Sequence, residues 1–156
     1  MSPTPSPRDI TCDLLVVGSG AGGLATAISA RKHGLDVIVV EKAATFGGTT
    51  AYSGGVLWIP GSHHGRAQNP HDSRAAVLTY LKHQAGAGFD EGAVEAFLDH
   101  APEMVEWFER ETEVRFVPTM YPDYHPDAPG GVDVGRSILA APYNARRLGA
   151  EIRRAL

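Results

Sequence analysis

The 156-residue sequence predicts an α/β fold in three layers, with helices covering both faces of a parallel sheet. The runs Asp13–Val17 and Asp36–Val40 are apolar after their first residue, as expected of strands buried on both faces of such a sheet. Between them, Ala21–His33 is rich in Ala and Leu and precedes Gly34, a residue suited to ending a helix. A strand, a glycine turn, a helix and a strand within about thirty residues predict a βαβ unit over residues 12–42.

Composition limits the class of protein. The chain has 14 Lys and Arg against 18 Asp and Glu, a net charge of −4, which argues against a nucleic-acid partner. Cys12 is the only cysteine, so neither a disulfide within the chain nor a multi-cysteine metal site is expected. The longest apolar runs are too short for a transmembrane segment, and Met1–Cys12 lacks the apolar stretch of a secretory signal. We therefore expect a cytoplasmic protein.

Both ends of the chain have distinctive patterns. Prolines at alternate positions predict a disordered leader over residues 1–11. Leu148, Ile152 and Leu156 form one apolar stripe at helical spacing, which predicts a helix over 143–156 that lacks a capping signal. A doubly wound sheet needs about five or six parallel strands, and nothing after Glu41 predicts a second βαβ unit. We expect residues 12–156 to be the N-terminal part of a longer domain.

The middle of the chain departs from the βαβ pattern. Residues 43–61 include the glycine-rich stretch Gly47–Gly61, which predicts a loop, and residues 70–112 predict a helical segment. Within that segment we expect three helices: one capped by Asp72 or Ser73 and ending near Gln84, one capped by Asp90 and ending near Asp99, and one from Pro102 to Arg110. Glu113–Val117 predicts a short strand, and the five prolines of residues 118–142 predict an irregular loop.

The charge run Asp90–Glu113 contains nine acidic residues and one basic residue, Arg110. Such a run indicates a solvated helical face, with an acidic docking surface as the alternative.

The glycine turn after the first predicted strand is the strongest chemical signal, namely Gly18, Ser19, Gly20, Ala21, Gly22 and Gly23. Gly18 permits a tight turn, Gly20 lets the backbone approach a pyrophosphate, and Gly23 lets the helix pack closely on the strand. The start of the helix offers free N–H groups and a partial positive charge to phosphates. The alternative is a glycine turn that binds nothing.

Glu41 closes the second predicted strand, with 17 residues between it and Gly23. A carboxylate at this position can accept hydrogen bonds from both ribose hydroxyls of an adenosine, and it would repel the 2′-phosphate of NADP. The turn and the acid together predict a site for FAD or NAD.

The residues that follow favour FAD. Glu41-Lys42 and the stretch Phe46–Pro60 resemble flavoproteins of the fumarate reductase/succinate dehydrogenase family, and within it the 3-ketosteroid Δ1-dehydrogenases. The resemblance implies a Rossmann-like FAD/NAD(P)-binding domain with a helical insertion. It also implies that the backbone and short hydroxyls of the second half of the site, Gly48, Thr49, Thr50, Ser53, Gly54 and Gly55, follow the pyrophosphate toward the flavin ring. Lys42 is predicted to pair with a phosphate or ribose, or else to be solvated.

The resemblance extends to residues 121–126, 129–131 and 135–136, and it implies a dehydrogenase acting on CH–CH bonds (EC 1.3 type). Its substrate would be an apolar 3-ketosteroid or another cyclic ketone, and its electron acceptor is unknown. A hydride would pass between substrate and flavin while a side chain moves the neighbouring proton. In those enzymes the second tyrosine of an Asp-Tyr-Tyr-Pro run is catalytic, whereas this chain has Asp123-Tyr124-His125-Pro126, with a histidine in its place. We expect His125 and Tyr124 to be the catalytic candidates, with a structural loop histidine and aromatic packing as the alternatives.

Histidine positions bear on covalent flavin and on metals. Related succinate dehydrogenases tether their flavin through a histidine a few residues before a Gly-Gly pair. The matching stretch here, Gly47–Ser53, contains no histidine and has Gly48 at the matching place, so we expect non-covalent FAD. His63 and His64 are predicted to lie in a loop and His71 beside a helix cap, and no carboxylate shares a helix face with them at ligand spacing. We therefore expect no metal site.

Two alternatives to the flavin enzyme remain. One is a truncated nucleotide-binding remnant without catalysis, and the other is an NAD-linked dehydrogenase, which the stretch Gly47–Gly55 argues against. We expect the 156 residues on their own to be inactive.

Overall fold

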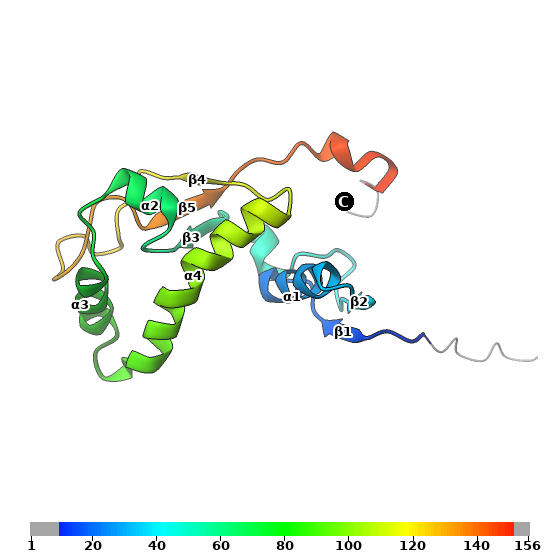
Figure 1. Cartoon of the computed structure of the whole chain (residues 1–156), viewed down its shortest axis with the longest axis horizontal. Coiled ribbons are helices and arrows are strands. Elements are labelled where there is room, and N and C mark those ends of the chain that lie inside the picture. The colour runs from blue at the N-terminus through cyan, green and yellow to red at the C-terminus, as the bar shows by residue number, and fades with distance from the viewer. Residues whose placement is uncertain (1–9, 152–156) are drawn as a thin grey trace, which may run out of the picture. The chain divides into compact units, whose positions relative to one another are not determined.

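A computed structural model describes residues 10–151 of the chain, which fall into two compact units (Figure 1). The first unit comprises residues up to Ser53 together with those from Ala145 onward. The second unit comprises Gly54–Asn144. Each unit has its own sheet, so each is described separately.

The first unit contains the predicted βαβ arrangement. Strands β1 (Leu14–Val17) and β2 (Val37–Val40) are parallel and paired in register from Leu14 opposite Val37 to Val17 opposite Val40. Helix α1 (Ala21–Lys32) connects them and packs against both. It ends where Gly34 takes a left-handed conformation (φ +84°), which glycine adopts without steric cost.

The strands are less buried than the sequence predicts. Val16 is buried, but Leu15, Val17, Val39 and Val40 are exposed in the described residues. The expectation of strands covered on both faces is wrong for this chain because two strands and one helix cover little of the sheet.

The ends of the first unit also differ from expectation. The described part of the predicted helix 143–156 is a 3₁₀ segment, η3 (Ala145–Glu151), which is interrupted at Gly149 by a left-handed conformation (φ +56°). Ile152 and Leu156 of the predicted stripe lie outside the described residues, as do residues 1–9 of the predicted leader. A second 3₁₀ segment, η1 (Gly48–Tyr52), lies within the predicted flavin loop.

The second unit is built on an antiparallel sheet in the order β3-β5-β4. Strand β5 (Ser137–Ala140) lies between β3 (Val56–Trp58) and β4 (Phe116–Pro118). Two predicted loops, 43–61 and 118–142, therefore each contain a strand, and the expectation that they are irregular throughout is wrong. The strand predicted at Glu113–Val117 begins three residues later than expected, and β4 ends at Pro118. Since β4 is an edge strand, this proline costs no sheet hydrogen bond.

Three α-helices and one 3₁₀ turn complete the second unit. They are α2 (His63–Gln68), α3 (Arg74–Ala85), η2 (Gly86–Gly88) and α4 (Glu91–Glu111). The helical segment begins at His63, earlier than the predicted residue 70. Ser62, Ser73 and Asp90 cap the three α-helices by accepting a backbone N–H three residues ahead. Of the two predicted caps for α3, the one that accepts this bond is Ser73.

Helix α4 runs without a break through Pro102, so the two helices expected on either side of this proline are one helix. An internal proline costs about 3 kcal/mol because a backbone hydrogen bond is lost. The buried residues Leu98, Ala101 and Val105 lie at helical spacing across it, so the apolar face is continuous. Val105 and Ala101 join Ile59, Phe116 and Ile138 in the core between α4 and the sheet. Burial of this face offsets the cost of Pro102.

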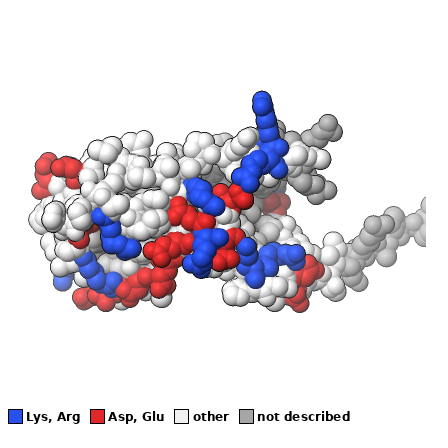
Figure 2. All heavy atoms as spheres, turned by 45° about the horizontal axis from the view of Figure 1, so that its top comes forward, with Lys and Arg blue, Asp and Glu red and all other residues white. Residues whose placement is uncertain are grey.

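The acidic run of α4 is more extensively paired than a solvated face. Asp99 and Glu95 lie 2.6 and 3.5 Å from Arg74 of α3, and Glu106 lies 3.6 Å from Arg66 of α2. On the face that Figure 2 shows, Lys and Arg side chains lie next to Asp and Glu side chains in several places. Among the described helices, none has the length and apolar character needed to cross a membrane.

Candidate functional site

The glycine turn between β1 and α1 has the backbone geometry that its sequence predicts. Gly18 is left-handed (φ +97°), and its N–H donates to the carbonyl of Val40, which ties the turn to β2. A Cβ atom on Gly23 would lie 2.0 Å from the carbonyl oxygen of Gly18. Only glycine at position 23 therefore allows α1 to begin this close to the turn.

Gly20 and Gly22 have a different environment. A Cβ atom on either residue would meet no other atom within 4 Å. Gly20 is the N-cap of α1 and has no side chain to cap it, while the next amide, that of Ala21, donates to Thr50 Oγ1 at 3.2 Å. The N-terminus of α1 is thus open toward solvent at these two glycines. An exposed helix N-terminus of this kind fits a phosphate group.

Glu41 lies beside the turn and is held by three hydrogen bonds. Its Oε2 accepts from the N–H of Ser19 at 2.9 Å and from the Ser19 hydroxyl, and its Oε1 accepts from the N–H of Ala43 at 2.9 Å. The bonds from Ala43 and Ser19 lower the pKa of Glu41 from 4.5 to about 2, so the carboxylate is ionised at neutral pH. Because Oε2 accepts two bonds already, Oε1 keeps the free lone pair for a further donor such as a ribose hydroxyl.

Ser19 is 1% exposed and connects three segments of this site. Its hydroxyl donates to Glu41 and accepts from the N–H of Gly47 at 2.9 Å. The side chain therefore faces away from the open side of the turn and positions Glu41 and the next loop.

The loop after β2 is brought against the turn in the first unit. A Cβ atom on Gly48 would lie 3.3 Å from the Cα of Gly20, and Thr50 bonds the start of α1. Lys42, Thr49 and Ser53 are exposed, and the Ser53 hydroxyl donates to the carbonyl of Thr50. The remaining two predicted cofactor residues, Gly54 and Gly55, belong to the second unit, where the Gly55 carbonyl accepts from the N–H of Ala140.

The catalytic candidates Tyr124 and His125 lie in the second unit, in the segment between β4 and β5. Tyr124 is 98% exposed, and His125 is exposed as well. The backbone N–H of His125 donates to the hydroxyl of Tyr80 at 3.3 Å. A hollow of about 500 Å³ is lined by both residues and by His83 and Gln84 of α3. Both candidate side chains are therefore accessible to a small molecule.

Asp123, directly before these candidates, is buried; its carboxylate accepts three hydrogen bonds and its backbone N–H donates one. Its carboxylate accepts from Trp58 Nε1 at 2.7 Å, from Arg136 Nη1 at 2.8 Å and from the N–H of Val132 at 3.2 Å, while its own N–H donates to the Val132 carbonyl. These contacts hold the backbone of the segment that contains Tyr124 and His125.

Arg136 is 1% exposed and joins Asp123 to Asp72. Its Nε and Nη2 donate to the two oxygens of Asp72 at 2.9 and 2.7 Å, a bidentate pair. Burial lowers the pKa of Arg136, but the bonds to Asp72 and the charges of Asp72 and Asp123 outweigh burial, so the net shift is upward. Arg136 stays charged.

Sequence reasoning missed this Asp72–Arg136–Asp123 group as a structural unit. The available signal was a charged residue, Arg136, directly before the apolar residues of Ser137–Ala140.

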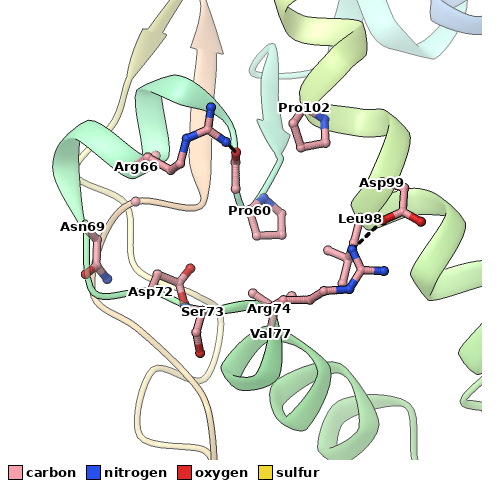
Figure 3. A pocket seen from close by; sticks show the side chains of 13 residues that line it. Pro60, Arg66, Asn69, Asp72, Ser73, Arg74, Val77, Leu98, Asp99 and Pro102 are labelled. Atoms are coloured by element: carbon pink, nitrogen blue, oxygen red, sulfur yellow. Dashed lines mark hydrogen bonds and ion pairs between the residues drawn. The ribbon is translucent and has the colours of Figure 1, made fainter.

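A separate hollow of about 340 Å³ in the second unit is lined by residues of α2, α3 and α4 (Figure 3). Arg74 points across it to Asp99, to which it is bonded at 2.6 Å. Asp72 at its edge is bonded to Arg136. Since these charged groups are paired with one another, we assign no catalytic role to this hollow.

Comparison with known proteins gives one family for nearly the whole chain. Residues 13–156 match the family described as the FAD binding domain. The chain is 50% identical over 143 residues to a 4-oxocyclohex-2-ene-1-carboxylate 5-dehydrogenase of Sinomonas cyclohexanicum, covering 91% of this chain and 24% of that protein. It is 43% identical over 142 residues to a 3-oxosteroid 1-dehydrogenase of Mycobacterium tuberculosis, covering 90% and 25%.

A solved structure that is similar to this chain belongs to the same class of enzyme as these relatives. The crystal structure of the 3-ketosteroid delta1-dehydrogenase from Sterolibacterium denitrificans, in complex with 1,4-androstadiene-3,17-dione, matches with a TM-score of 0.83 and 38% identity, covering 92% of this chain and 25% of that one. The chain thus spans about a quarter of the length of the relatives it matches. These findings confirm the predicted resemblance, the α/β fold and the preference for FAD over NAD. The chain belongs to the FAD binding domain family.

Proposed function

We propose that this chain is the FAD-binding part of a flavin-dependent dehydrogenase whose substrate is an apolar cyclic ketone. The observation that carries the proposal is the open N-terminus of α1 at Gly20 and Gly22, beside an ionised Glu41. The names of the relatives, which act on a 4-oxocyclohexene carboxylate and on 3-oxosteroids, support the substrate class. The reaction type is oxidoreduction at a CH–CH bond.

The residues of the first unit divide the binding task between them. The backbone at Gly20 and Gly22 binds the pyrophosphate, because a Cβ atom at either residue meets no other atom within 4 Å. A contact from Ala21 stays a prediction of the sequence, since its N–H donates to Thr50 Oγ1. Glu41 accepts ribose hydroxyls through Oε1, and Ser19 holds Glu41 in place. The other cofactor contacts stay predictions of the sequence; they involve Gly18, Gly23, Lys42, Gly48, Thr49, Thr50, Ser53, Gly54 and Gly55. Binding is non-covalent, since no histidine occurs in Gly47–Ser53.

FAD supplies the hydride transfer when bound. Proton transfer falls to the protein, and in this chain Tyr124 and His125 are the candidates because both side chains are exposed beside a hollow. An imidazole at position 125 can polarise a carbonyl or accept and donate a proton. Asp123 and Arg136 act as positioning residues for this segment. The cytoplasmic location stays a prediction of the composition, and the electron acceptor is unassigned.

The test of FAD binding is Gly20→Val in the full-length protein that contains this chain. Gly20 has an extended backbone (φ −68°, ψ −178°) that any residue adopts, and a Cβ atom there meets nothing. The variant should therefore fold but lose FAD, because the valine fills the space next to the helix N-terminus. The measurement is flavin absorbance per protein after desalting, with circular dichroism to check folding.

Gly88→Val is the matched control, since a Cβ atom at Gly88 also meets nothing within 4 Å and no cofactor role is predicted there. We expect this control to keep its flavin. Normal flavin content in Gly20→Val, or equal loss in both variants, would refute the pyrophosphate site.

A further inference from the structure

Three side chains that the FAD proposal does not use meet in the second unit. His63 and His64 are the first two residues of α2, and Glu109 lies near the end of α4. The Nε2 atom of His63 lies 3.0 Å from Glu109 Oε2, and the Nε2 atom of His64 lies 3.0 Å from Glu109 Oε1. One donor atom from each residue lies within 4.8 Å of the others. The two imidazoles and the carboxylate therefore converge on one point.

Hydrogen bonds to Glu109 leave one buried nitrogen of this cluster without a hydrogen-bond partner. The Nδ1 atom of His63 is buried and has no hydrogen-bond partner, and Glu106 Oε1 lies 3.9 Å from it. The 3.9 Å from Nδ1 to Glu106 Oε1 is too long for a hydrogen bond, so this buried nitrogen lacks a partner. Buried polar atoms in this state are rare and need an explanation.

A metal ion on Nε2 removes this difficulty. The imidazole proton then resides on Nδ1 and points toward Glu106. A metal-bound histidine that donates its other N–H to a carboxylate is the usual arrangement around metal sites. Glu106 is itself 3.6 Å from Arg66, which limits its movement.

We propose that His63, His64 and Glu109 bind a divalent transition-metal ion, with Zn²⁺ the best fit. Two imidazoles and one carboxylate are zinc ligands, and three protein ligands leave the fourth position for water. Zinc bonds of about 2.0–2.1 Å in a tetrahedron place neighbouring donors about 3.3 Å apart, close to the 3.0 Å between His63 and Glu109.

The surroundings of Glu109 favour one mode of binding. Its Oε1 accepts the N–H of Phe116 at 2.9 Å, which fixes the orientation of the carboxylate at the start of β4. Oε2 is then the oxygen available to the ion. The side chains of His63, His64 and Glu109 are each partly exposed, so an ion and its water can enter. The bound ion would join α2 to α4, whose residues have no predicted role in FAD binding.

The expectation of no metal site rested on the lack of a carboxylate at helical spacing from His63 and His64. The two histidines lie in a helix instead of the predicted loop, and Glu109 is supplied by another helix, 45 residues after His64.

The test uses the purified full-length protein with its flavin, first dialysed against a chelator and then titrated with Zn²⁺ alone. A chromophoric chelator in competition reports the affinity, and elemental analysis after desalting reports the stoichiometry. We expect one Zn²⁺ per chain, and at least a 100-fold weaker affinity in His63→Gln, His64→Gln and Glu109→Gln. Glu106→Gln removes the carboxylate toward which Nδ1 of a metal-bound His63 would donate, and it should weaken binding about 10- to 100-fold.

His100→Gln is the matched control. His100 also pairs with an acid on α4, Glu103 at 3.3 Å, but its side chain is 77% exposed and outside the cluster. This variant should bind Zn²⁺ as the parent does. Co²⁺ provides a second readout, since a tetrahedral site gives it intense visible absorption bands that Gln variants should lose.

Flavin content and circular dichroism show whether each variant folds. If Glu109→Gln fails to fold, the two histidine variants decide, since they leave the bond between Glu109 and Phe116 intact. Less than stoichiometric Zn²⁺ in the parent, full binding in His63→Gln, or equal loss in His100→Gln would each overturn the proposal.

Discussion

Replacing Arg136 by methionine should strongly destabilise the second unit. The side chain is buried, and methionine has a comparable length without a charge. The substitution leaves the carboxylates of Asp72 and Asp123 without their cation, and their side chains are only 9% and 2% exposed. Removing one partner of a buried ion pair costs about 3–5 kcal/mol, because the remaining charge stays in a poorly solvated place.

Arg74→Met is the control that separates the effect of burying the ion pair from the effect of removing a positive charge. Arg74 also contacts two carboxylates, those of Asp99 and Glu95, but its side chain is 42% exposed. Exposed pairs of this kind contribute about 0–1 kcal/mol. The two substitutions should therefore differ by at least about 2 kcal/mol in free energy of unfolding, which is more than tenfold in the unfolding equilibrium.

Urea denaturation of the purified protein, followed by tryptophan fluorescence, measures this difference. Trp58 is a local reporter because the Arg136 guanidinium lies 5.8 Å from its ring. Adding Asp123→Asn to Arg136→Met should recover part of the stability, since it neutralises one of the two charges left behind. Equal destabilisation by Arg136→Met and Arg74→Met, or no recovery in the double variant, would refute the reasoning.

Three further predictions concern the cofactor. Because the pKa of Glu41 is lowered to about 2, its ionised form and the stability that it provides persist above pH 4.5 and are lost as the pH falls toward 2. Ser19→Ala removes one cause of that shift, so free-flavin fluorescence should appear at a higher pH than in the parent; an unchanged release pH would contradict this. Acid precipitation should release all flavin into the supernatant, and flavin in the pellet would indicate a covalent bond. Residues 1–156 expressed alone with excess FAD should be poorly soluble and show no dehydrogenase turnover with 3-oxosteroids above that of free flavin, since strands β1 and β2 expose Val17, Val39 and Val40.

The parts of the fold that the sequence predicts correctly have strong local signals. Strands β1 and β2 are uninterrupted apolar runs, and the glycine turn between β1 and α1 is defined by residues next to one another. Ser73 and Asp90 are recognisable as caps because a capping side chain bonds a backbone N–H only three residues ahead. Each of these features depends on chain segments shorter than about fifteen residues.

The parts that were not predicted depend on distant partners. Strands β3 and β5 are three and four residues long and lie among glycines and prolines, so their identity as strands comes from pairing across the second unit. Helix α4 continues through Pro102 because its apolar face packs on that sheet, which no local propensity reveals. Arg136 and Asp72 are separated by 64 residues, and the pair is recognisable only once the chain is folded.

The candidate site shows the same division. Glu41 was found from its spacing to the glycine turn, whereas the role of Ser19 in holding it depends on a bond across 22 residues. Sequence reasoning treated Ser19 as one member of the turn. The structure gives it a separate task, which is to orient the acid and the loop at Gly47.

The segment that carries Tyr124 and His125 bears on position 125, where the resemblance to steroid dehydrogenases implies a tyrosine and this chain has a histidine. The structure anchors this segment through Asp123, by its bonds to Trp58, Arg136 and Val132, and through the backbone N–H of His125, which bonds Tyr80. Neither anchor involves the side chain at position 125, and that side chain is exposed. Exchange of a phenol for an imidazole at position 125 would therefore leave the contacts that anchor this segment intact.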